Sequence, residues 1–280
     1  MLHDPGVSLR YRAIWLSDIH LGYRHCKADM LLEFLAAVRC DTIFLVGDVI
    51  DLWSLAGQWH WPASHSAVLR ALLERAESGT RVVYVPGNHD ETMREFAGNA
   101  FGGIAIAPQC EHLTADGRRL LVTHGDEFEP LIRCSALTRV LGSASYSALL
   151  RLNRHYNHWR AWRGQPYWSL ATAIKNRVGN ARRAIEAFEL AALDYARAHG
   201  FDGIVCGHIH QPCTLEIDGA LYCNDGDWIE NCTALAETAA GELELLHWPR
   251  LRERLARPDA ANDHRADHAP HLPARTTARR

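Results

Sequence analysis

Five short clusters of carboxylate, amide and imidazole side chains occur along the chain, and each directly follows an apolar run. Mixed oxygen and nitrogen donors suit manganese, iron, zinc or magnesium ions rather than a soft thiolate site. Without cations, so many carboxylates gathered in one place would repel one another and be costly to desolvate. The pattern therefore predicts a divalent-metal centre. The clusters are Asp18-Ile19-His20, Gly47-Asp48, Asn88-His89-Asp90, His124-Gly125-Asp126 and Gly207-His208-Ile209-His210.

The elements that must position these clusters alternate between strand and helix patterns. Apolar, β-branched runs at 12–18, 41–48 and 81–87 are typical of strands, and the runs at 28–38 and 65–79 have helical spacing. Such alternation indicates an α/β fold with a largely parallel sheet, in which the carboxyl ends of the strands meet at one crevice. We therefore expect clusters that are far apart in the sequence to meet in space.

The second half of the chain contains further strand patterns, at 118–126 and 202–208. From 214 to 248, alternating runs are separated by Asp-Gly pairs at 218–219 and 225–226. Asp-Gly between alternating apolar runs is a strong hairpin signal. This segment predicts antiparallel hairpins that close a second sheet.

Each cluster taken alone has an ordinary structural explanation. His20 could be a buried, hydrogen-bonded imidazole, and Asp48 could cap the helix or turn that follows it. Asp90 and Asp126 could simply fix a loop. Five clusters at five predicted strand ends favour one common site over five separate explanations.

The order D-x-H, G-D, G-N-H-D, H-G-D and G-H-x-H resembles that of the calcineurin-like metallophosphoesterase family. The resemblance extends from about Ile14 to Trp248, apart from a basic segment described below. It implies an α/β fold, the αββα sandwich of two mixed sheets flanked by helices, with a helical cap insertion. It also implies a hydrolase of phosphoesters or pyrophosphates with two divalent metal ions, Mn²⁺ first, with Fe, Zn or Mg as alternatives.

The same resemblance implies a role for each matched position. Asp48 would bridge the two metal ions, and His89 would stabilise the transition state or protonate the leaving oxygen. Asp90 would orient His89 or pin the turn. The remaining implied ligands are Asp18, His20 and His210 for the first ion and Asn88, His124 and His208 for the second.

Longer stretches resemble one branch of this family, the UDP-2,3-diacylglucosamine diphosphatases. These stretches are LSDIHLG, GDVIDLW, YVPGNHDE, THGDEFE and VCGHIHQP. The resemblance implies cleavage of UDP-2,3-diacylglucosamine to UMP and 2,3-diacylglucosamine 1-phosphate, a step of lipid A biosynthesis. One position departs from the branch, whose best-known members carry Arg where this chain has His89. A His at that position also suits simpler phosphodiesters.

A basic and aromatic segment interrupts the resemblance. From 131 to 185 the chain has ten Lys and Arg residues and no Asp or Glu, with six Tyr and Trp interleaved. The sequence predicts a core of 1–130 plus 198–250, a helical cap insertion at 131–197 and a disordered tail at 251–280. The resemblance implies that the cap holds the acyl chains of a lipid-linked nucleotide-sugar. The candidate substrate contacts are Arg163, Trp168, Lys175 and Arg177.

Composition limits the partners and the location. The net charge is −3 with His neutral, so no nucleic-acid partner is expected. No apolar run is long enough for a signal peptide or a membrane span, which predicts a cytoplasmic protein. The basic, aromatic cap predicts peripheral contact with the anionic cytoplasmic face of the inner membrane. The eight cysteines form no C-x-x-C pair and are expected to be reduced thiols.

Two other functions stay open from the sequence. A nuclease or cyclic-nucleotide phosphodiesterase on the same scaffold would use the basic segment to hold a phosphate backbone. A non-catalytic scaffold would lack one or more metal ligands, whereas every matched ligand position is filled here.

Overall fold

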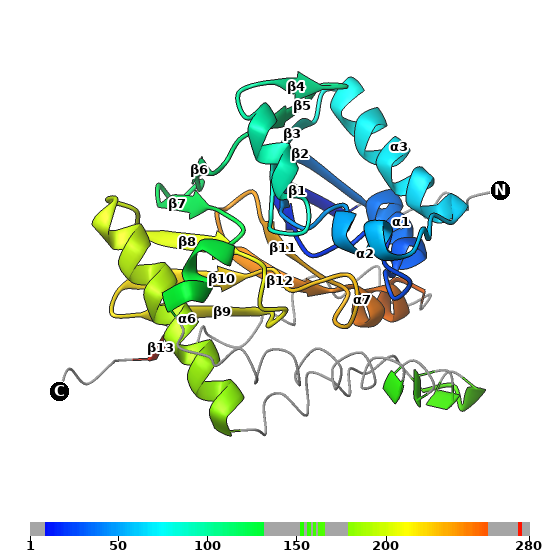
Figure 1. Cartoon of the computed structure of the whole chain (residues 1–280). Coiled ribbons are helices and arrows are strands. Elements are labelled where there is room, and N and C mark those ends of the chain that lie inside the picture. Colours follow the sequence, from blue (N-terminus) through cyan, green and yellow to red (C-terminus); the bar gives the residue numbers. More distant parts are fainter. Residues whose placement is uncertain are drawn as a thin grey trace.

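The computed structural model describes two long stretches of the chain and several short ones. The described residues are 9–131, 152–153, 156–157, 159–160, 162–165, 179–256 and 274–275. In them, two mixed β-sheets pack face to face, and helices cover the outer face of each sheet (Figure 1). The predicted αββα arrangement of two mixed sheets is confirmed.

The first sheet has a parallel centre and antiparallel edges. β1, β2, β3 and β5 are parallel neighbours, and β11 and β4 pair antiparallel with β1 and β5. In spatial order the strands are β12 (Leu243–His247), β11 (Thr233–Glu237), β1 (Leu9–Leu16), β2 (Val38–Val46), β3 (Arg81–Val85), β5 (Ile104–Ile106) and β4 (Ala100–Phe101). The carboxyl-terminal halves of β1, β2 and β3 are continuously buried apolar runs, as expected for parallel strands covered on both faces.

The second sheet is also mixed, with β7, β8 and β10 as parallel neighbours. β9 and β10 form a hairpin whose turn residues, Asp218 and Gly219, both have positive φ, as a two-residue type I′ turn requires. In spatial order the strands are β13 (Ala274–Arg275), β9 (Cys213–Ile217), β10 (Ala220–Asn224), β8 (Gly203–Cys206), β7 (Arg119–Val122) and β6 (Cys110–Leu113).

Helices form the two outer layers. α1 buries Leu31, Phe34 and Leu35 against the first sheet, at the three- and four-residue spacing of one helix face. α1, α3 and α7 contribute to this outer cluster, and α6 covers the second sheet. The helices are α1 (Ala28–Ala37), α2 (Leu52–Gly57), α3 (Ala63–Glu77), α6 (Gly179–Ala198) and α7 (Trp248–Leu255), with 3-10 turns η1 (Glu91–Phe96) and η2 (Asp126–Leu131).

The layer between the two sheets is mostly apolar and includes a buried polar pair, His112 and Glu237, at 2.6 Å. Trp15 of β1 stacks on Phe44 of β2 with ring centroids 5.3 Å apart. These rings share a buried cluster with Val122 of β7 and Val205 of β8. The close packing fixes one sheet against the other, so the strand ends that carry the polar clusters of both sheets have defined relative positions.

One hairpin lies in a different sheet from the one that the sequence predicts. β9 and β10 belong to the second sheet, but β11 and β12 join the first, where Ala13 of β1 pairs with Glu237 of β11. The segment between Asn224 and Thr233 carries the chain from one sheet to the other. An alternating pattern determines which face of a strand is buried but not which strand lies beside it, so the sequence alone did not separate the two hairpins.

The boundary of the predicted cap insertion also changes. Within 131–197, the described helix α6 packs on the second sheet through Phe188, Leu193 and Ala196, whose side chains are fully buried. That part of the chain is therefore a layer of the core. Residues 132–151 and 166–178, where most of the predicted cap falls, lie outside the described residues.

The predicted tail begins later than residue 251. Helix α7 continues to Leu255, and Arg252 donates to Glu33 of α1 at 2.8 Å. The pair Ala274–Arg275 lies parallel to β9. The rest of the predicted tail falls outside the described residues. In the part of the chain that the structure covers, we find no helix with both the length and the apolar character needed to cross a bilayer.

Candidate metal centre

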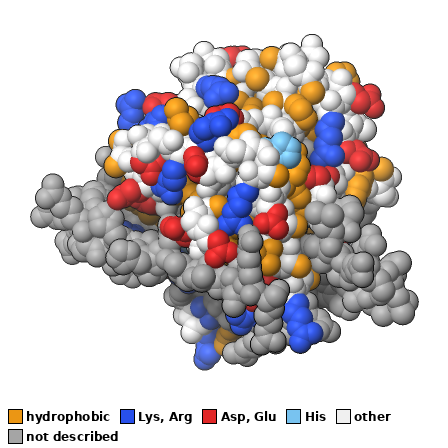
Figure 2. All heavy atoms as spheres, turned by 90° about the vertical axis from the view of Figure 1, so that its left-hand side faces the viewer, with side chains coloured by type: hydrophobic (Ala, Val, Ile, Leu, Met, Phe, Trp, Pro, Cys, Tyr) orange, Lys and Arg blue, Asp and Glu red, His pale blue; other side chains and the backbone are white. Residues whose placement is uncertain are grey.

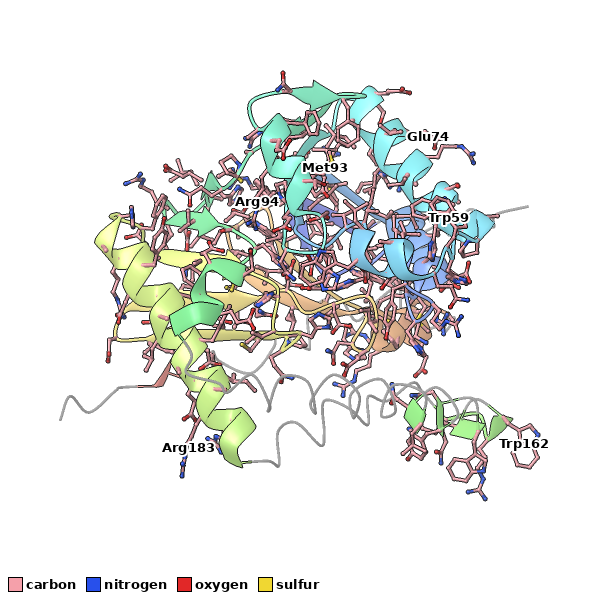
Figure 3. The ribbon with its side chains drawn as sticks, in the orientation of Figure 1. Trp59, Glu74, Met93, Arg94, Trp162 and Arg183 are labelled. Atoms are coloured by element: carbon pink, nitrogen blue, oxygen red, sulfur yellow. The ribbon has the colours of Figure 1, made fainter. Side chains whose placement is uncertain are left out.

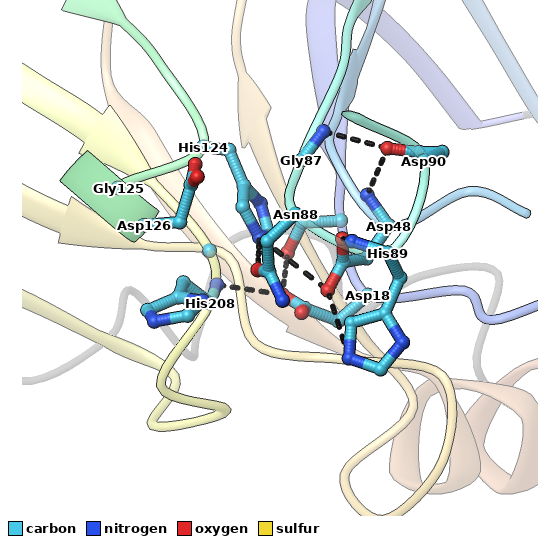
Figure 4. A network of polar contacts seen from close by, with 12 residues as sticks. Asp18, Asp48, Gly87, Asn88, His89, Asp90, His124, Gly125, Asp126 and His208 are labelled. Carbon is cyan, nitrogen blue, oxygen red and sulfur yellow. Dashed lines mark hydrogen bonds and ion pairs between the residues drawn. The ribbon is translucent and has the colours of Figure 1, made fainter. Parts of the chain in front are cut away.

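The polar clusters follow β1, β2, β3, β7 and β8, and the structure brings them together at one edge of the two sheets (Figure 4). The first two loops are joined by backbone hydrogen bonds, from Asp18 N to Gly47 O at 3.1 Å and from His20 N to Asp48 O at 2.8 Å. The predicted meeting of distant clusters is therefore observed between both sheets, and not within a single parallel sheet as the sequence suggests.

The backbone at these positions adopts a conformation that side chains usually avoid. Among the described residues, seven non-glycine residues have positive φ, and five of them are predicted metal ligands. Left-handed backbone is unfavourable for residues with a Cβ and accumulates at functional sites. The five ligands are Asp18, His20, Asp48, His208 and His210.

The carboxylate of Asp48 lies at the centre of the cluster. Its Oδ2 atom is 3.6 Å from His20 Nε2 and 3.4 Å from His124 Nε2. Asp18 Oδ1 is 3.1 Å from His210 Nε2 on one side of the cluster. On the other side, Asn88 Oδ1 is 3.3 Å from His124 Nε2. One carboxylate thus faces two groups of donor atoms.

The donor set fits divalent cations. Asp18, His20 and His210 each offer an atom within 4.8 Å of the others, and so do Asp18, Asp48 and His124. The facing atoms Asp18 Oδ1 and His20 Nε2 are 3.7 Å apart and buried, and neither has a hydrogen-bond partner among the described residues. Buried polar atoms are rarely left without partners, so these two are suited to a shared ligand.

Three glycines of the motifs make room for these side chains. A Cβ at Gly47 would lie 2.1 Å from His124 Nδ1, and one at Gly87 would lie 2.3 Å from Asp48 Oδ1. A Cβ at Gly207 would lie 2.5 Å from Asp18 Oδ2. All three distances are too short for non-bonded atoms, so the glycines of G-D, G-N-H-D and G-H-x-H allow the ligands to approach.

His208 is the predicted ligand with the least direct geometry. Its ring lies beside that of His124, with centroids 5.2 Å apart, and its backbone N donates to Asp18 Oδ2 at 2.8 Å. Its Nε2 atom is 3.6 Å from Glu129 Oε2. The ring is therefore next to the cluster, with a carboxylate beside it that the sequence did not single out.

Electrostatics within the cluster favour ionised carboxylates. Burial alone would raise the pKa of Asp18, but the imidazoles of His210 and His20 hold it well below its usual range. Burial lowers the pKa of His20, whereas the neighbouring carboxylates of Asp18 and Asp51 raise it to about 10. The site thus demands positive charge next to its carboxylates, and divalent cations bound by neutral imidazoles can supply it.

Asp51 is a functional residue that the sequence analysis did not select. Its buried carboxylate contacts two rings, with Oδ2 3.0 Å from His20 Nδ1 and Oδ1 2.9 Å from His89 Nδ1. Burial raises the pKa of Asp51, but the bonds to His20 and His89 bring it well below the usual range. The signal was the second Asp of GDVID, which resembles an ordinary helix cap and does accept from Ser54 N at 2.7 Å.

His89 lies at the rim of the cluster. Its backbone N donates to Asp48 Oδ1 at 2.8 Å, and its Nε2 atom is 3.9 Å from Asp48 Oδ2. Its side chain is 25 % exposed, and the ring of Trp53 covers it at a centroid distance of 4.2 Å. The ring therefore faces both the cluster and solvent, where a substrate can reach it.

Asp90 holds the turn. Its carboxylate accepts from Gly87 N at 2.6 Å, from Val49 N at 2.7 Å and from the hydroxyl of Tyr84. The sequence left two roles open, and these bonds correspond to pinning the turn, because the residue that contacts the His89 ring is Asp51. Burial and the charge of Asp48 raise the pKa of Asp90.

Asp126 joins two of the loops that carry ligands. Both of its carboxylate oxygens accept from Arg94 Nη2, at 2.7 and 2.9 Å. Arg94 Nη2 is also 3.2 Å from Pro86 O, next to the Gly87 turn. Arg94 lies above the cluster on η1 (Figure 3). The loop after β3 and the loop after β7 are thereby held together.

The predicted substrate contacts are mostly outside the described residues. Trp168, Lys175 and Arg177 all lie there. Arg163 is described and exposed, with its guanidinium 4.7 Å from the ring centroid of Trp159. Arg163 therefore makes a cation–π contact with its own segment.

The comparison with protein families identifies the class to which this fold and site belong. The sequence model of the calcineurin-like phosphoesterase family matches residues 11–212, and the chain belongs to that family. It is a metal-dependent phosphoesterase, a hydrolase whose clustered His and Asp side chains are suited to divalent metals.

Among known proteins, the chain is similar to UDP-2,3-diacylglucosamine hydrolases. Those of Shigella sonnei (strain Ss046) and Escherichia coli O139:H28 are 23 % identical to it over 257 residues, which cover 84 % of this chain and 98 % of theirs. Solved structures that match include an archaeal phosphodiesterase, with 14 % identity, a TM-score of 0.41 and coverage of 84 % of this chain and 98 % of that one. The phosphoesterase Yfce of E. coli matches with 15 % identity, a TM-score of 0.38 and the same two coverages.

Proposed function

We propose that this protein is a dinuclear-metal hydrolase that cleaves the pyrophosphate of UDP-2,3-diacylglucosamine, giving UMP and 2,3-diacylglucosamine 1-phosphate. The observation that carries the proposal is the carboxylate of Asp48 between two groups of imidazole and oxygen donors. The similarity to UDP-2,3-diacylglucosamine hydrolases over nearly their full length supports the choice of substrate.

The proposed ligand sets follow the two sides of the cluster. Asp48 would be a ligand shared by the two ions. Two divalent cations, Mn²⁺ in the first instance, would neutralise the pyrophosphate and activate water for in-line displacement. The other ligands are Asp18, His20 and His210 for one ion and Asn88, His124 and His208 for the other.

His89 is the proposed acid or electrostatic group at the leaving oxygen. Its ring is accessible, and its Nε2 atom lies 3.9 Å from Oδ2 of the Asp48 carboxylate, which supports a role beside the proposed metal ions. The carboxylate of Asp51 accepts a hydrogen bond from Nδ1 of His89 and so keeps the ring in a fixed orientation. The pair allows His89 to hold a proton at Nε2 toward the substrate.

Action on a lipid substrate requires contact with a membrane surface. We place the protein on the cytoplasmic face of the inner membrane, as a peripheral protein. Trp162 is 81 % exposed and points away from the core (Figure 3), and Arg163 and Trp159 are its neighbours. Exposed Trp beside Arg is typical of surfaces that lie in the headgroup region of anionic lipids. Flotation with phosphatidylglycerol vesicles tests this, and a protein that stays at the bottom of the gradient contradicts it.

The decisive experiment is hydrolysis of the proposed substrate. Incubation with UDP-2,3-diacylglucosamine and Mn²⁺, followed by mass spectrometry, should yield UMP and the acylated sugar phosphate. In ¹⁸O water, label in UMP identifies attack on the phosphorus next to uridine, and label in the sugar phosphate identifies attack on the other. Intact lipid substrate beside rapid hydrolysis of bis-p-nitrophenyl phosphate would refute the substrate while preserving the chemistry.

A phosphodiesterase of simpler nucleotides is the second candidate, and His89 favours it. A His in G-N-H-D can protonate the alkoxide that leaves from an ordinary diester as well as the phosphate oxygen that leaves from a pyrophosphate. For a nucleic-acid substrate, a continuous basic surface would be expected, but Arg and Lys are intermixed with Asp and Glu on the face drawn in Figure 2. Faster turnover of cyclic or dinucleotide diesters than of the lipid substrate would favour the phosphodiesterase.

A further inference from the structure

A pocket of about 340 Å³ opens between helix α6 and the start of β9, beside the metal centre. α6 lies across the second sheet at this place (Figure 1). The pocket volume is within the range of small-ligand sites. Gln211, which lines the pocket, directly follows the proposed metal ligand His210 in the chain. A group bound in this pocket is therefore close to the reacting phosphate.

Among the described residues, the side-chain amide nitrogen of Gln211 has no hydrogen-bond partner. Gln211 is only 8 % exposed, and its Nε2 atom is buried without a hydrogen-bond partner in the described part of the chain. A buried amide donor without an acceptor costs about 1–3 kcal/mol. The amide of Gln211 also has a carbonyl oxygen beside this donor, so it can pair with a ligand that presents an acceptor next to a donor.

The charges of the pocket select against anions. Glu189 is 5 % exposed and lines the pocket together with Glu186. Among the described lining residues Arg182 is the one cation, and it donates to Glu186 at 3.0 Å. The described lining therefore carries a net negative charge, which disfavours a phosphate or a fatty-acid head. A neutral group is favoured instead.

The walls of the pocket suit a flat ring. Ile185, Pro212 and Leu215 provide apolar surface on both sides of the polar groups. A pyrimidine such as uracil has apolar faces, and its edge carries a carbonyl acceptor beside an N–H donor. That edge is the complement of a glutamine amide, in the way that Asn and Gln pair with adenine edges. A purine edge can pair with a glutamine amide as well, so only its larger ring would distinguish it from a pyrimidine in this pocket.

We infer that this pocket binds the pyrimidine base of the nucleotide substrate, with Gln211 paired to the base edge. The inference rests on the proposed function, since it names the subsite for the uridine end of the substrate. Gln211 is then a specificity residue, and α6 is a wall of the substrate site as well as a layer of the core. Ribose and phosphate would extend from the pocket toward His210.

Product inhibition tests the subsite without the lipid substrate. Hydrolysis of bis-p-nitrophenyl phosphate is measured with UMP or ribose 5-phosphate as inhibitor, and the ratio of the two inhibition constants isolates the base. We expect wild type to bind UMP at least about 10-fold more tightly than ribose 5-phosphate, since one good bidentate pair to a base is worth about that factor. Gln211→Leu should lower this ratio by about the same factor. Gln211→Glu, which keeps the size but cannot donate, should do the same.

The control is Gln58→Leu, at an exposed glutamine of the surface, which should keep the wild-type ratio. Equal inhibition by UMP and ribose 5-phosphate in wild type, or an unchanged ratio in both Gln211 variants, would overturn the inference. Hydrolysis of UDP-2,3-diacylglucosamine is measured separately. If wild type cleaves that lipid without preferring UMP, only the subsite fails. If the protein prefers UMP, and this preference depends on Gln211, but the lipid is not cleaved, then only the proposed substrate is wrong.

Discussion

At the residue scale, Asp48 is the side chain on which the metal centre most depends. Three imidazole nitrogens lie within 3.9 Å of its Oδ2 atom. Removing a residue that only hydrogen-bonds to a metal ligand typically costs about 10–100-fold in affinity or activity. Asp48→Ala removes a shared ligand and should therefore cost more than about 100-fold in turnover, with loss of most bound Mn²⁺.

Metal analysis by mass spectrometry and turnover of bis-p-nitrophenyl phosphate measure the effect of Asp48→Ala. The matched control is Asp41→Ala, at an exposed carboxylate of β2, the strand that precedes Asp48; Asp41 pairs with Arg10 at 3.5 Å. The control should keep metal and rate. Wild-type turnover in Asp48→Ala would refute a bridged pair of ions.

A second residue-scale prediction separates catalysis from metal binding. His89→Ala removes a ring that contacts Asp51 and faces solvent but is not among the proposed ligands. The variant should keep its metal while the rate falls by about 10²–10⁴-fold, as is typical for loss of a general acid or base. Single-turnover kinetics and metal content are the two measurements. Loss of metal together with the rate would make His89 a ligand.

The sequence predicts which clusters meet but not which side chains support them, for a physical reason. Asp18, Asn88 and His208 each follow a strand end, a position that periodicity reveals. Asp51 has no such position, because its contact with His89 depends on how α2 turns back after β2. Its cap bond to Ser54 is what any Asp at a helix start would make, so nothing local distinguishes it.

At the element scale, the G-N-H-D turn must pass very close to the loop after β2. A Cβ at Gly87 would lie 2.3 Å from Asp48 Oδ1 and 2.7 Å from Asp48 N. Gly87→Ala should therefore displace the shared carboxylate, lowering metal affinity and costing about 1–3 kcal/mol through overpacking. Titration with Mn²⁺ and thermal unfolding measure both effects.

The control for Gly87→Ala is Gly57→Ala. Gly57 ends α2, and a Cβ there meets nothing within 4 Å. Alanine at an open helical position changes stability by less than about 1 kcal/mol, in the stabilising direction. If both variants bind Mn²⁺ like wild type, the close approach at Gly87 has no role in the site.

Helix α6 is the element whose placement the sequence missed. The apolar residues between 179 and 198 have helical spacing, but spacing alone does not say whether the apolar face packs on a cap or on a sheet. Phe188 is fully buried against the second sheet, and Leu190 on the same helix is 37 % exposed. Phe188→Ala should destabilise the fold by about 3–5 kcal/mol. Leu190→Ala should cost less than about 1 kcal/mol, and equal losses in urea unfolding would contradict the packing.

At the scale of the whole molecule, the sequence predicts the layers and the shared edge but not the division of strands between sheets. β11 is buried on both faces, like a strand of either sheet. Only the packing of Trp15 and Phe44 against Val122 and Val205 decides which strands can lie side by side. The metal centre depends on this packing, since Asp18, Asp48 and Asn88 come from one sheet and His124, His208 and His210 from the other.

The stability of the fold at acid pH should depend on His247, which is not among the proposed metal ligands. Burial, and then the charge of Arg250, lower the pKa of His247 to about 4 in the folded protein. In the unfolded chain a His titrates near 6.5, so between these two values only the unfolded state binds the proton. Stability is therefore fully present above about pH 6.5 and falls as the pH drops toward 4, by about 1–3 kcal/mol. Urea unfolding of His247→Gln should show a shallower decline over this range than wild type, whereas His199→Gln, at an exposed position on the end of α6, should decline like wild type. Parallel curves for His247→Gln and wild type would assign the acid sensitivity to other groups.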